Sequence, residues 1–385
     1  MESKERVRFS ERAAQSLMSD SLKLNGALLG RNPGNRDLPA WLISAPSAVT
    51  LFVAAAHSLV LGAMLQPRRW DVAVFHSLNE TWYDGAFFNA IANAPFDASI
   101  QLDSPPYRYQ RILYPLLARA LALGDTERIS WTLLLITFGS VVAGTYILAR
   151  LLKEWSLSPW YAATYGLFLG QFISIRFDTS EPLCFILVLL AIWAIEHERV
   201  RTASFCFALA LLAKELALLF LLPFIAVRLA RRQCRDAAVL TAAALPYALW
   251  QMMLFFWLKE FGFFSGPRIP LVPFGGFLAG GFSPAAALVP LMLLLPAVLA
   301  VCLAIWHWRG AGGVWSIMLL LNALLIIFVP SESSGEMRAL ARLSLGFVLA
   351  TLLFGGRLRV SRVLNYSILW IPVSCIFIPS MFYGL

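Results

Sequence analysis

The sequence predicts an all-α polytopic membrane protein with about 11 transmembrane helices. Apolar stretches long enough to cross a bilayer, about 20 residues, recur from Trp41 to the end of the chain. Only 14% of the 385 residues are charged and the mean hydropathy is +0.71, whereas about a quarter of a soluble domain is charged. The strict alternation of an outer-membrane barrel is not seen. The five cysteines form no C-x-x-C, so neither a disulfide frame nor a metal knuckle is indicated.

Residues 1–41 are polar and of mixed charge, with no cleavable signal peptide, and are expected to form a cytoplasmic N-terminal tail. Residues 42–385 form the transmembrane domain, whose first external loop, 67–129, is the largest. The predicted spans are 42–66, 130–152, 160–176, 182–197, 203–213, 216–228, 237–258, 284–306, 314–330, 341–356 and 363–383. The chain carries a net charge of +9, which we assign to a basic cytoplasmic face and not to nucleic-acid binding.

Residues 203–228 allow two interpretations. They are one long helix with Lys214 and Glu215 at its middle, or two short helices that meet at this pair. A hairpin with a cytoplasmic N-terminus puts most of the 31 Lys and Arg residues inside, whereas a single span divides them about evenly. The positive-inside rule therefore favours the hairpin. A single span would instead move every later loop to the opposite side of the membrane.

The loop 67–129 begins with the segment "WYDGAFFNAIANAPFD", residues 82–97, which mixes aromatic and polar side chains. A short interfacial helix is predicted there, because four apolar residues recur at helical spacing. They are Phe88, Ile91, Ala92 and Pro95. Asn89 lies on another face of this helix. Asp84 is either the N-cap of this helix or a catalytic acid, and the two roles are compatible.

The loop continues with "LDSPPYRYQRILYPLLARALALG", residues 102–124, where a second short helix is predicted to end at Gly124. Its apolar stripe is Ile112, Leu113, Leu116, Leu117, Ala120 and Leu121. Arg111 lies off that stripe, and Tyr107 and Arg108 precede it. Guanidinium groups bind phosphate in bidentate geometry. The alternative is interfacial anchoring by Tyr and Arg at the headgroup level.

Three motifs in order resemble the GT-C-type membrane glycosyltransferases, in particular the mannosyltransferases that build glycolipid anchors and their bacterial relatives. "YDGAFFNAIA" (83–92) followed by "YRYQRILYPLLARAL" (107–121) is similar to the first external loop of that family. "FDTSEPLCFIL" (177–187) and "ALLAKELALL" (210–219) are similar to two later segments, so the resemblance covers about residues 82–220.

The resemblance implies an enzyme that moves a sugar, mannose in the nearest members, from a polyprenyl-phosphate donor to a lipid, glycan or protein acceptor on the external face. Asp84 matches the loop acid that the family uses as general base. Lys214 and Glu215 match an Arg-Glu pair, with Lys in place of Arg. Many members carry a paired acid in this loop, but Trp82 and Tyr83 precede Asp84 here. Because the paired acid is missing, no metal ligand is predicted, and whether the activity depends on Mg²⁺ or Mn²⁺ stays open.

Further polar residues lie on the same predicted side of the membrane. Arg108, Arg111, Lys214 and Arg338 are the candidate phosphate ligands. The candidate supporting residues are Asn89, Tyr107, Asp178 and Glu181. For Asp178 and Glu181 the alternative is to complement the dipole at the start of the 182–197 span. The Gly- and Pro-containing segment "GFFSGPRIPLVPFGGF", 262–277, is a lid over a lipid chain or an interfacial loop.

The leading hypothesis is an integral glycosyltransferase of the bacterial inner membrane with a periplasmic active site, although the endoplasmic reticulum is an alternative. A multi-span lipid or solute transporter or flippase is the alternative function, since a broken helix is typical of transporters. No Walker A segment is present, which argues against transport driven by ATP.

Overall fold

The computed structural model describes residues 40–64, 84–97, 100, 102–279, 288–308 and 312–377. Contacts divide the chain into residues 1–40 and residues 41–385, and the architecture below is that of the second unit. The predicted tail therefore lies outside the described residues, except for the start of the first helix. Helices make up 80% of the structure, and the described residues contain no strand.

Helices occur in the described part of each predicted span. From the N-terminal side these are α2 (Ala40–Met64), α7 (Thr126–Glu154), η1 (Pro159–Tyr161), α8 (Ala162–Gly166), α9 (Leu169–Arg176), α10 (Glu181–Glu196), α11 (Val200–Ala213), η2 (Glu215–Ala217), α12 (Leu218–Ala230), α13 (Cys234–Thr241), η3 (Ala242–Ala244), α14 (Leu245–Leu258), α16 (Leu288–Trp306), α17 (Gly313–Ile327), α19 (Met337–Arg357), α20 (Ser361–Ser367) and α21 (Trp370–Phe377). The shorter helices are α4 (Asp84–Asn93), α5 (Pro105–Tyr109), α6 (Leu113–Leu121), η4 (Gly262–Phe264), α15 (Gly275–Ala279) and α18 (Ser331–Ser334).

Three helices of the described chain are long and apolar enough to cross a membrane. They are α7, the continuous rod Cys234–Leu258 formed by α13, η3 and α14, and α19. Four further apolar helices are shorter: Ile43–Leu59, Val200–Ala213, Met292–Trp306 and Gly313–Ile327. These segments indicate that the chain is integrated in a membrane.

The chain reverses direction at Lys214. The rings of Phe207 in α11 and Phe224 in α12 are 6.2 Å apart, whereas one continuous helix would separate them by about 25 Å. The reversal is local, because Lys214 has an extended backbone (φ −164°, ψ 136°) that ends α11. The geometry therefore matches the hairpin interpretation of residues 203–228.

Two predicted spans are interrupted. Residues 160–176 form η1, α8 and α9, because the backbone of Phe168 is extended (φ −70°, ψ 140°). The amide of Leu169, freed by this break, donates to Ser374 Oγ at 2.7 Å. The segment 363–383 likewise appears as two helices, α20 and α21, over its described part.

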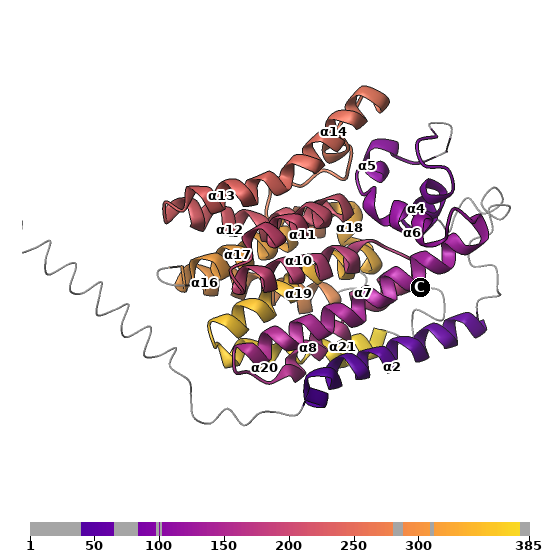
Figure 1. Ribbon diagram of the computed structural model, residues 1–385. Coiled ribbons are helices and arrows are strands. Elements are labelled where there is room, and N and C mark those ends of the chain that lie inside the picture. The colour runs from indigo at the N-terminus through magenta and orange to yellow at the C-terminus, as the bar shows by residue number, and fades with distance from the viewer. Residues whose placement is uncertain are drawn as a thin grey trace, which may run out of the picture. The chain divides into compact units, whose positions relative to one another are not determined.

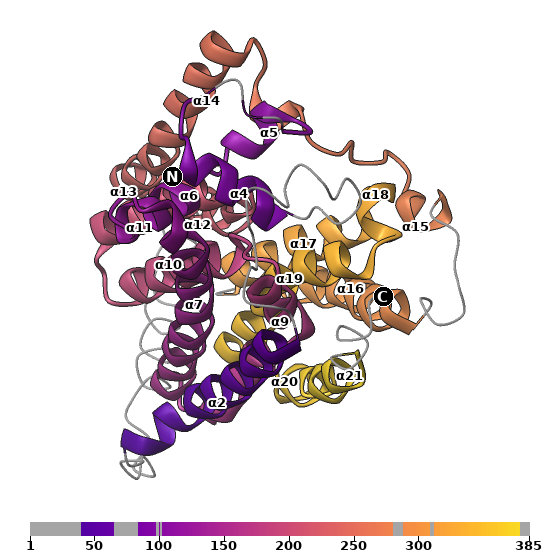
Figure 2. The ribbon, with the colours of Figure 1, turned by 90° about the vertical axis from the view of Figure 1, so that its right-hand side faces the viewer.

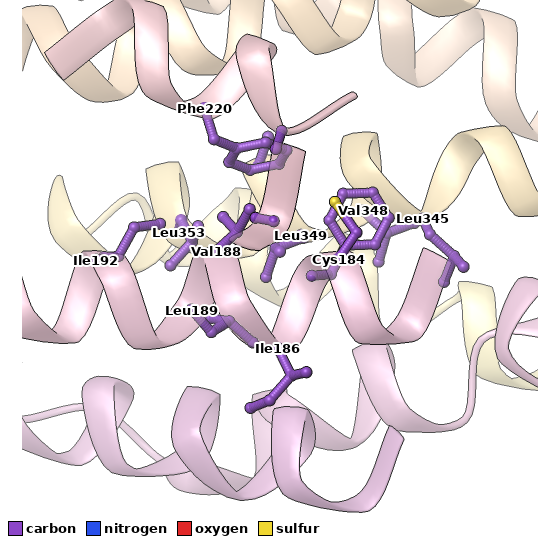
Figure 3. Packing of buried hydrophobic residues seen from close by; sticks show 14 of the residues in the cluster. Cys184, Ile186, Val188, Leu189, Ile192, Phe220, Leu345, Val348, Leu349 and Leu353 are labelled. Atoms are coloured by element: carbon purple, nitrogen blue, oxygen red, sulfur yellow. The ribbon is translucent and has the colours of Figure 1, made fainter. Parts of the chain in front are cut away.

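The core centres on α10, which packs against α7, α11 and α19. Its side chains are apolar on every face, as expected of a helix surrounded by other helices. Figure 3 shows Val188 and Ile192 of α10 with Phe220 of α12 and Leu349 of α19, all fully buried. The long helices therefore form one packed bundle, and α4, α5 and α6 lie together at one end of it (Figure 1).

The two predicted loop helices exist, but their environments differ from the prediction. Phe88, Ile91 and Ala92 of α4 are buried against other parts of the protein instead of resting on a lipid surface, and Pro95 lies beyond the end of α4.

In the second helix the predicted stripe is only partly buried: Ile112 is buried, but Leu121 is 53% exposed, and Tyr114, which is not on the stripe, is fully buried. Leu113, Leu116 and Leu117 are partly buried against the core. The stripe therefore faces outward only at its C-terminal end, where in lipid an apolar side chain need not be buried by protein.

Candidate functional site: a buried ion cluster

Charged side chains from five separate segments meet at the end of the bundle that carries α4, α5 and α6. We call this set the ion cluster. Its members are Asp84, Asp103, Arg108, Arg111, Glu181, Lys214, Glu215 and Arg342. All but Asp103 are largely buried, with side chains 18% exposed or less. Four cationic groups thus face four carboxylates, which satisfies the rule that buried charges are paired.

Asp84 lies in the first turn of α4 and joins two distant arginines. Its Oδ1 accepts from Arg108 Nη1 at 2.5 Å, and its Oδ2 accepts from Arg342 Nη1 at 2.7 Å. The next residue must be glycine, because a Cβ on Gly85 would lie 2.1 Å from the carbonyl oxygen of Phe177. This close approach of α4 to the turn before α10 brings Asp84 into the cluster.

Arg342 also connects Asp84 to the second carboxylate. Its Nη1 lies 3.1 Å from Glu181 Oε1, at the first residue of α10. The same oxygen accepts from Lys214 Nζ at 2.6 Å. The break at Lys214 that reverses the chain therefore also delivers the ammonium group to Glu181. The hairpin and the cluster depend on the same residue.

Glu215, the next residue, turns the other way and binds Arg111. The pair is bidentate, with Nη2–Oε1 at 2.7 Å and Nε–Oε2 at 3.1 Å. Arg111 also donates to Tyr107 Oη at 2.7 Å, and its guanidinium lies 4.4 Å from the centre of the Tyr107 ring. A bidentate geometry adds orientation as well as energy, so Arg111 is fixed in one position.

Arg108 is held from the opposite side by Asp103. Its Nε and Nη2 donate to the two oxygens of Asp103 at 2.8 and 2.6 Å. The guanidinium lies 4.2 Å from the centre of the Phe87 ring. Arg108 thus presents one edge to a half-exposed carboxylate and another to the buried Asp84.

The electrostatics keep Asp84 ionised. Burial alone raises the pKa of a carboxyl, but the guanidinium groups of Arg342 and Arg108, with smaller contributions from Arg111 and Lys214, more than offset it. The net effect holds the pKa of Asp84 well below its ordinary value. For Asp103, burial also raises the pKa, but the hydrogen bonds and charge of Arg108, together with the hydrogen bond from the Ser104 amide, lower it overall.

The sequence-predicted site residues divide into three groups: members of the cluster, residues at its border and one residue away from it. The cluster contains Asp84, Arg108, Arg111, Lys214, Glu215 and Glu181, with Tyr107 as a ligand of Arg111. Asn89 lies elsewhere, since it donates to Ser130 Oγ at 2.8 Å and ties α4 to α7.

Two predicted residues lie at the border of the cluster. Arg338 pairs with Glu336 at 2.7 Å, and both side chains are more than one-third exposed. Its guanidinium lies 5.5 Å from the ring of Phe177. Asp178 is buried beside Phe177 in a left-handed backbone conformation, with φ of 46°. Neither residue is paired with Asp84.

Two features were not predicted. Lys214 and Glu215 do not form a pair with each other, because adjacent residues at a chain break point to opposite sides and take different partners. Arg342 was not chosen although it holds Asp84 and Glu181 together. Its position inside an apolar span is a pattern that marks functional sites and could have identified it.

A metal site is not evident from the side chains. Across the ranges that the structure describes, no group of three or more His, Cys, Asp or Glu residues could hold a metal ion. The carboxylates of the ion cluster are each paired with an arginine or lysine instead.

No family model, no curated protein and no solved structure matches this chain. The ion cluster itself presents three guanidinium groups and one ammonium group, which are the usual protein ligands of phosphate and carboxylate. It also presents a carboxylate, Asp84, that is ionised and central. The arrangement therefore places cationic groups that can bind an anion around an ionised carboxylate, within one site at the end of an apolar bundle.

Proposed function

We propose that this protein is a membrane glycosyltransferase that moves a sugar from a polyprenyl-phosphate donor to an acceptor at the periplasmic face of a bacterial inner membrane. The observation that carries the proposal is the ion cluster, in which Arg108, Arg111, Lys214 and Arg342 surround Asp84. A lipid-linked donor cannot leave the bilayer, so its phosphate must be met at the end of the membrane helices. The full proposal includes about 11 membrane spans and a cytoplasmic N-terminus.

The transfer balances as follows. The acceptor hydroxyl oxygen forms a bond to the anomeric carbon of the sugar, and the bond from that carbon to the phosphate oxygen breaks. The electron pair stays on the phosphate, whose charge changes from about −1 in the diester to about −2 in the free monoester. The hydroxyl proton goes to Asp84 as general base. Guanidinium groups that are already in place stabilise the charge that develops on the phosphate.

The arginines that hold Asp84 also make it a weak base. A general base works best when its pKa lies near the operating pH, and the pKa of Asp84 is held far below that by Arg342 and Arg108 after they offset burial. Donor phosphate that takes over either arginine removes that influence and raises the pKa of Asp84. Donor binding would thus both supply the leaving group and activate the base.

The transporter alternative has one observation in its favour, namely the chain break at Lys214 with charged residues on both sides of it. Discontinuous helices of this kind build substrate sites near the membrane midplane in transporters. The ion cluster lies instead at the helix starts of α10 and α4 and in the first turns of α19. This position favours chemistry at the headgroup level over passage through the centre.

The proposal is tested by donor consumption. Purified wild type, Asp84→Asn and Asp125→Asn are incubated with a panel of polyprenyl-phosphate sugars and a membrane lipid extract. Asp125 is a matched control because it caps α7, accepting from Glu127 N at 3.0 Å, outside the cluster. We expect wild type and Asp125→Asn to consume one donor and folded Asp84→Asn to lose on the order of 10²-fold or more in rate. No consumption by wild type, or full activity of Asp84→Asn, would favour the transport alternative.

A further inference from the structure

We propose that residues 261–274, here called the aromatic loop, insert their apolar side chains into the lipid leaflet beside the ion cluster. The loop connects α14 to α15 and contains little regular structure beyond η4 (Figure 2). Five of its exposed side chains are large and apolar. They are Phe263 (51% exposed), Phe264 (79%), Ile269 (63%), Leu271 (96%) and Val272 (61%). An exposed apolar surface of this kind marks an interaction site with protein or membrane.

The position of the loop identifies lipid as the partner. It follows directly from the rod Cys234–Leu258, which is a candidate membrane span. Only 28% of that span is buried by protein, against 50% for Thr126–Glu154 and 83% for Met337–Arg357. The rod therefore has the largest lipid-facing surface of the three, and the aromatic loop continues that surface past its end.

The end of the rod also determines how deep the aromatic loop lies in the leaflet. Lys259 terminates α14 in a left-handed conformation with φ of 65°. Backbone without regular hydrogen bonding is excluded from the hydrocarbon core, so the loop backbone must lie at the headgroup level. Its Phe, Ile and Leu side chains can reach the acyl boundary from there, while Lys259 and Arg268 stay with the headgroups.

Aromatic residues around the loop match this depth. Trp250 and Trp257 flank the last turns of the rod, and the Trp257 ring lies 4.8 Å from that of Tyr109. Trp250 donates from Nε1 to Tyr109 O at 2.8 Å. Trp and Tyr side chains are enriched at the membrane–water boundary, where one end is apolar and the other hydrogen-bonds.

The aromatic loop is fastened to the helix that carries the arginines. Ser104 Oγ, just before α5, donates to Ser265 O at 3.2 Å, and a Cβ on Gly262 would lie 2.3 Å from the carbonyl oxygen of Pro106 in α5. A Cβ on Gly266 would lie 2.6 Å from the Tyr107 ring, so the loop runs in contact with that ring. Tyr107 in turn holds Arg111. The lipid-facing loop and the ion cluster therefore share Tyr107, and insertion fixes α5 relative to the leaflet.

The experiment measures insertion directly and does not depend on transfer activity. Full-length protein with Cys206, Cys234, Cys302 and Cys375 replaced by Ser is given one labelling site, Phe264→Cys or Glu127→Cys. Both positions are exposed. An environment-sensitive fluorophore is attached, and the protein is reconstituted in phosphatidylcholine–phosphatidylglycerol vesicles. Quenching by shallow spin-labelled lipid is compared with quenching by aqueous iodide.

We expect the label at 264 to emit at shorter wavelength and to lose most of its fluorescence to the spin-labelled lipid, while the label at 127 is quenched by iodide. Quenching of both labels by iodide alone would overturn the proposal. Protection of the label at 264 from both quenchers would also overturn it, because a protein surface such as a second copy would then cover the loop. Failure of the donor assay with successful lipid quenching would reject only the glycosyltransferase proposal.

Discussion

The two ends of the helix bundle differ in how their charged side chains are arranged. At one end the ion cluster buries cations and carboxylates in equal number, and Lys214 and Glu181 are only 6% and 1% exposed. At the other end, where α10 finishes and α11 begins, Arg357 pairs with Glu196 at 3.3 Å with its side chain 40% exposed. There the chain carries mostly Arg and Lys on a solvated surface. Buried, balanced charges of the first kind are typical of a functional site. Exposed basic residues of the second kind are common next to the ends of membrane helices.

The difference in burial determines how much an ion pair at each end should contribute to the free energy of unfolding. A solvent-exposed ion pair is worth about 0–1 kcal/mol, because water competes for both groups. Removing one partner of a buried pair costs about 3–5 kcal/mol, because the other charge is left without compensation. The same substitution made at the two ends should therefore lower the free energy of unfolding by different amounts, and experiment can test this difference.

The largest expected effect is at Arg342. Arg342→Met leaves Asp84 and Glu181 facing each other without the guanidinium that joins them. We expect a loss of about 3–5 kcal/mol in the free energy of unfolding. Arg357→Met at the other end should lose no more than about 1 kcal/mol. Thermal unfolding in one detergent, followed by circular dichroism, measures both, and equal losses would remove the distinction between the ends.

The next effect is the coupling between Lys214 and Glu181. Lys214→Met leaves the buried carboxylate of Glu181 with Arg342 as its cation. Adding Glu181→Gln removes that charge, so the double variant should recover about 1–3 kcal/mol relative to Lys214→Met. The same cycle at Arg357 and Glu196 should show coupling of about 0–1 kcal/mol. Strict additivity at Lys214 and Glu181 would mean that the pair is solvated.

The sequence identified the helices well because each long apolar run must be helical in a membrane. It was less accurate for the face of α6, since Tyr114 is buried although it is not on the predicted stripe, while Leu121 of the stripe is exposed. An apolar stripe predicts the buried face only when water is outside. Partner choice within the cluster was also not predictable, because Asp84 and Arg342 are 258 residues apart and only the tertiary structure, with Gly85 of α4 against the turn before α10, brings them together.

A third prediction concerns pH. Burial raises the pKa of Asp84, but Arg342 and Arg108 lower it more, to below its ordinary value of 3.8. A carboxyl whose pKa is lower in the folded state adds stability above its unfolded pKa and loses it as the pH falls through the folded pKa. The difference in unfolding free energy between wild type and Asp84→Asn should thus be constant from about pH 8 to pH 5 and shrink only below about pH 4. A difference that disappears near pH 6 would show that the arginines do not hold Asp84.

The smallest effect is expected at the partly exposed ion pair between Arg228 and Asp236, at the basic end of the bundle. Arg228 pairs with Asp236 at 2.8 Å, and the two side chains are 24% and 36% exposed. Asp236→Asn should lower the free energy of unfolding by less than about 1 kcal/mol. Because 1 M salt shortens the screening length to about 3 Å, the loss should fall toward zero when the unfolding is repeated in 1 M KCl. Glu181→Gln is the contrasting variant, since its carboxylate is buried and salt should leave its larger loss nearly unchanged. Equal salt sensitivity of the two variants would mean that ions reach both ends alike, and the ion cluster would then be a solvated surface network instead of a buried site.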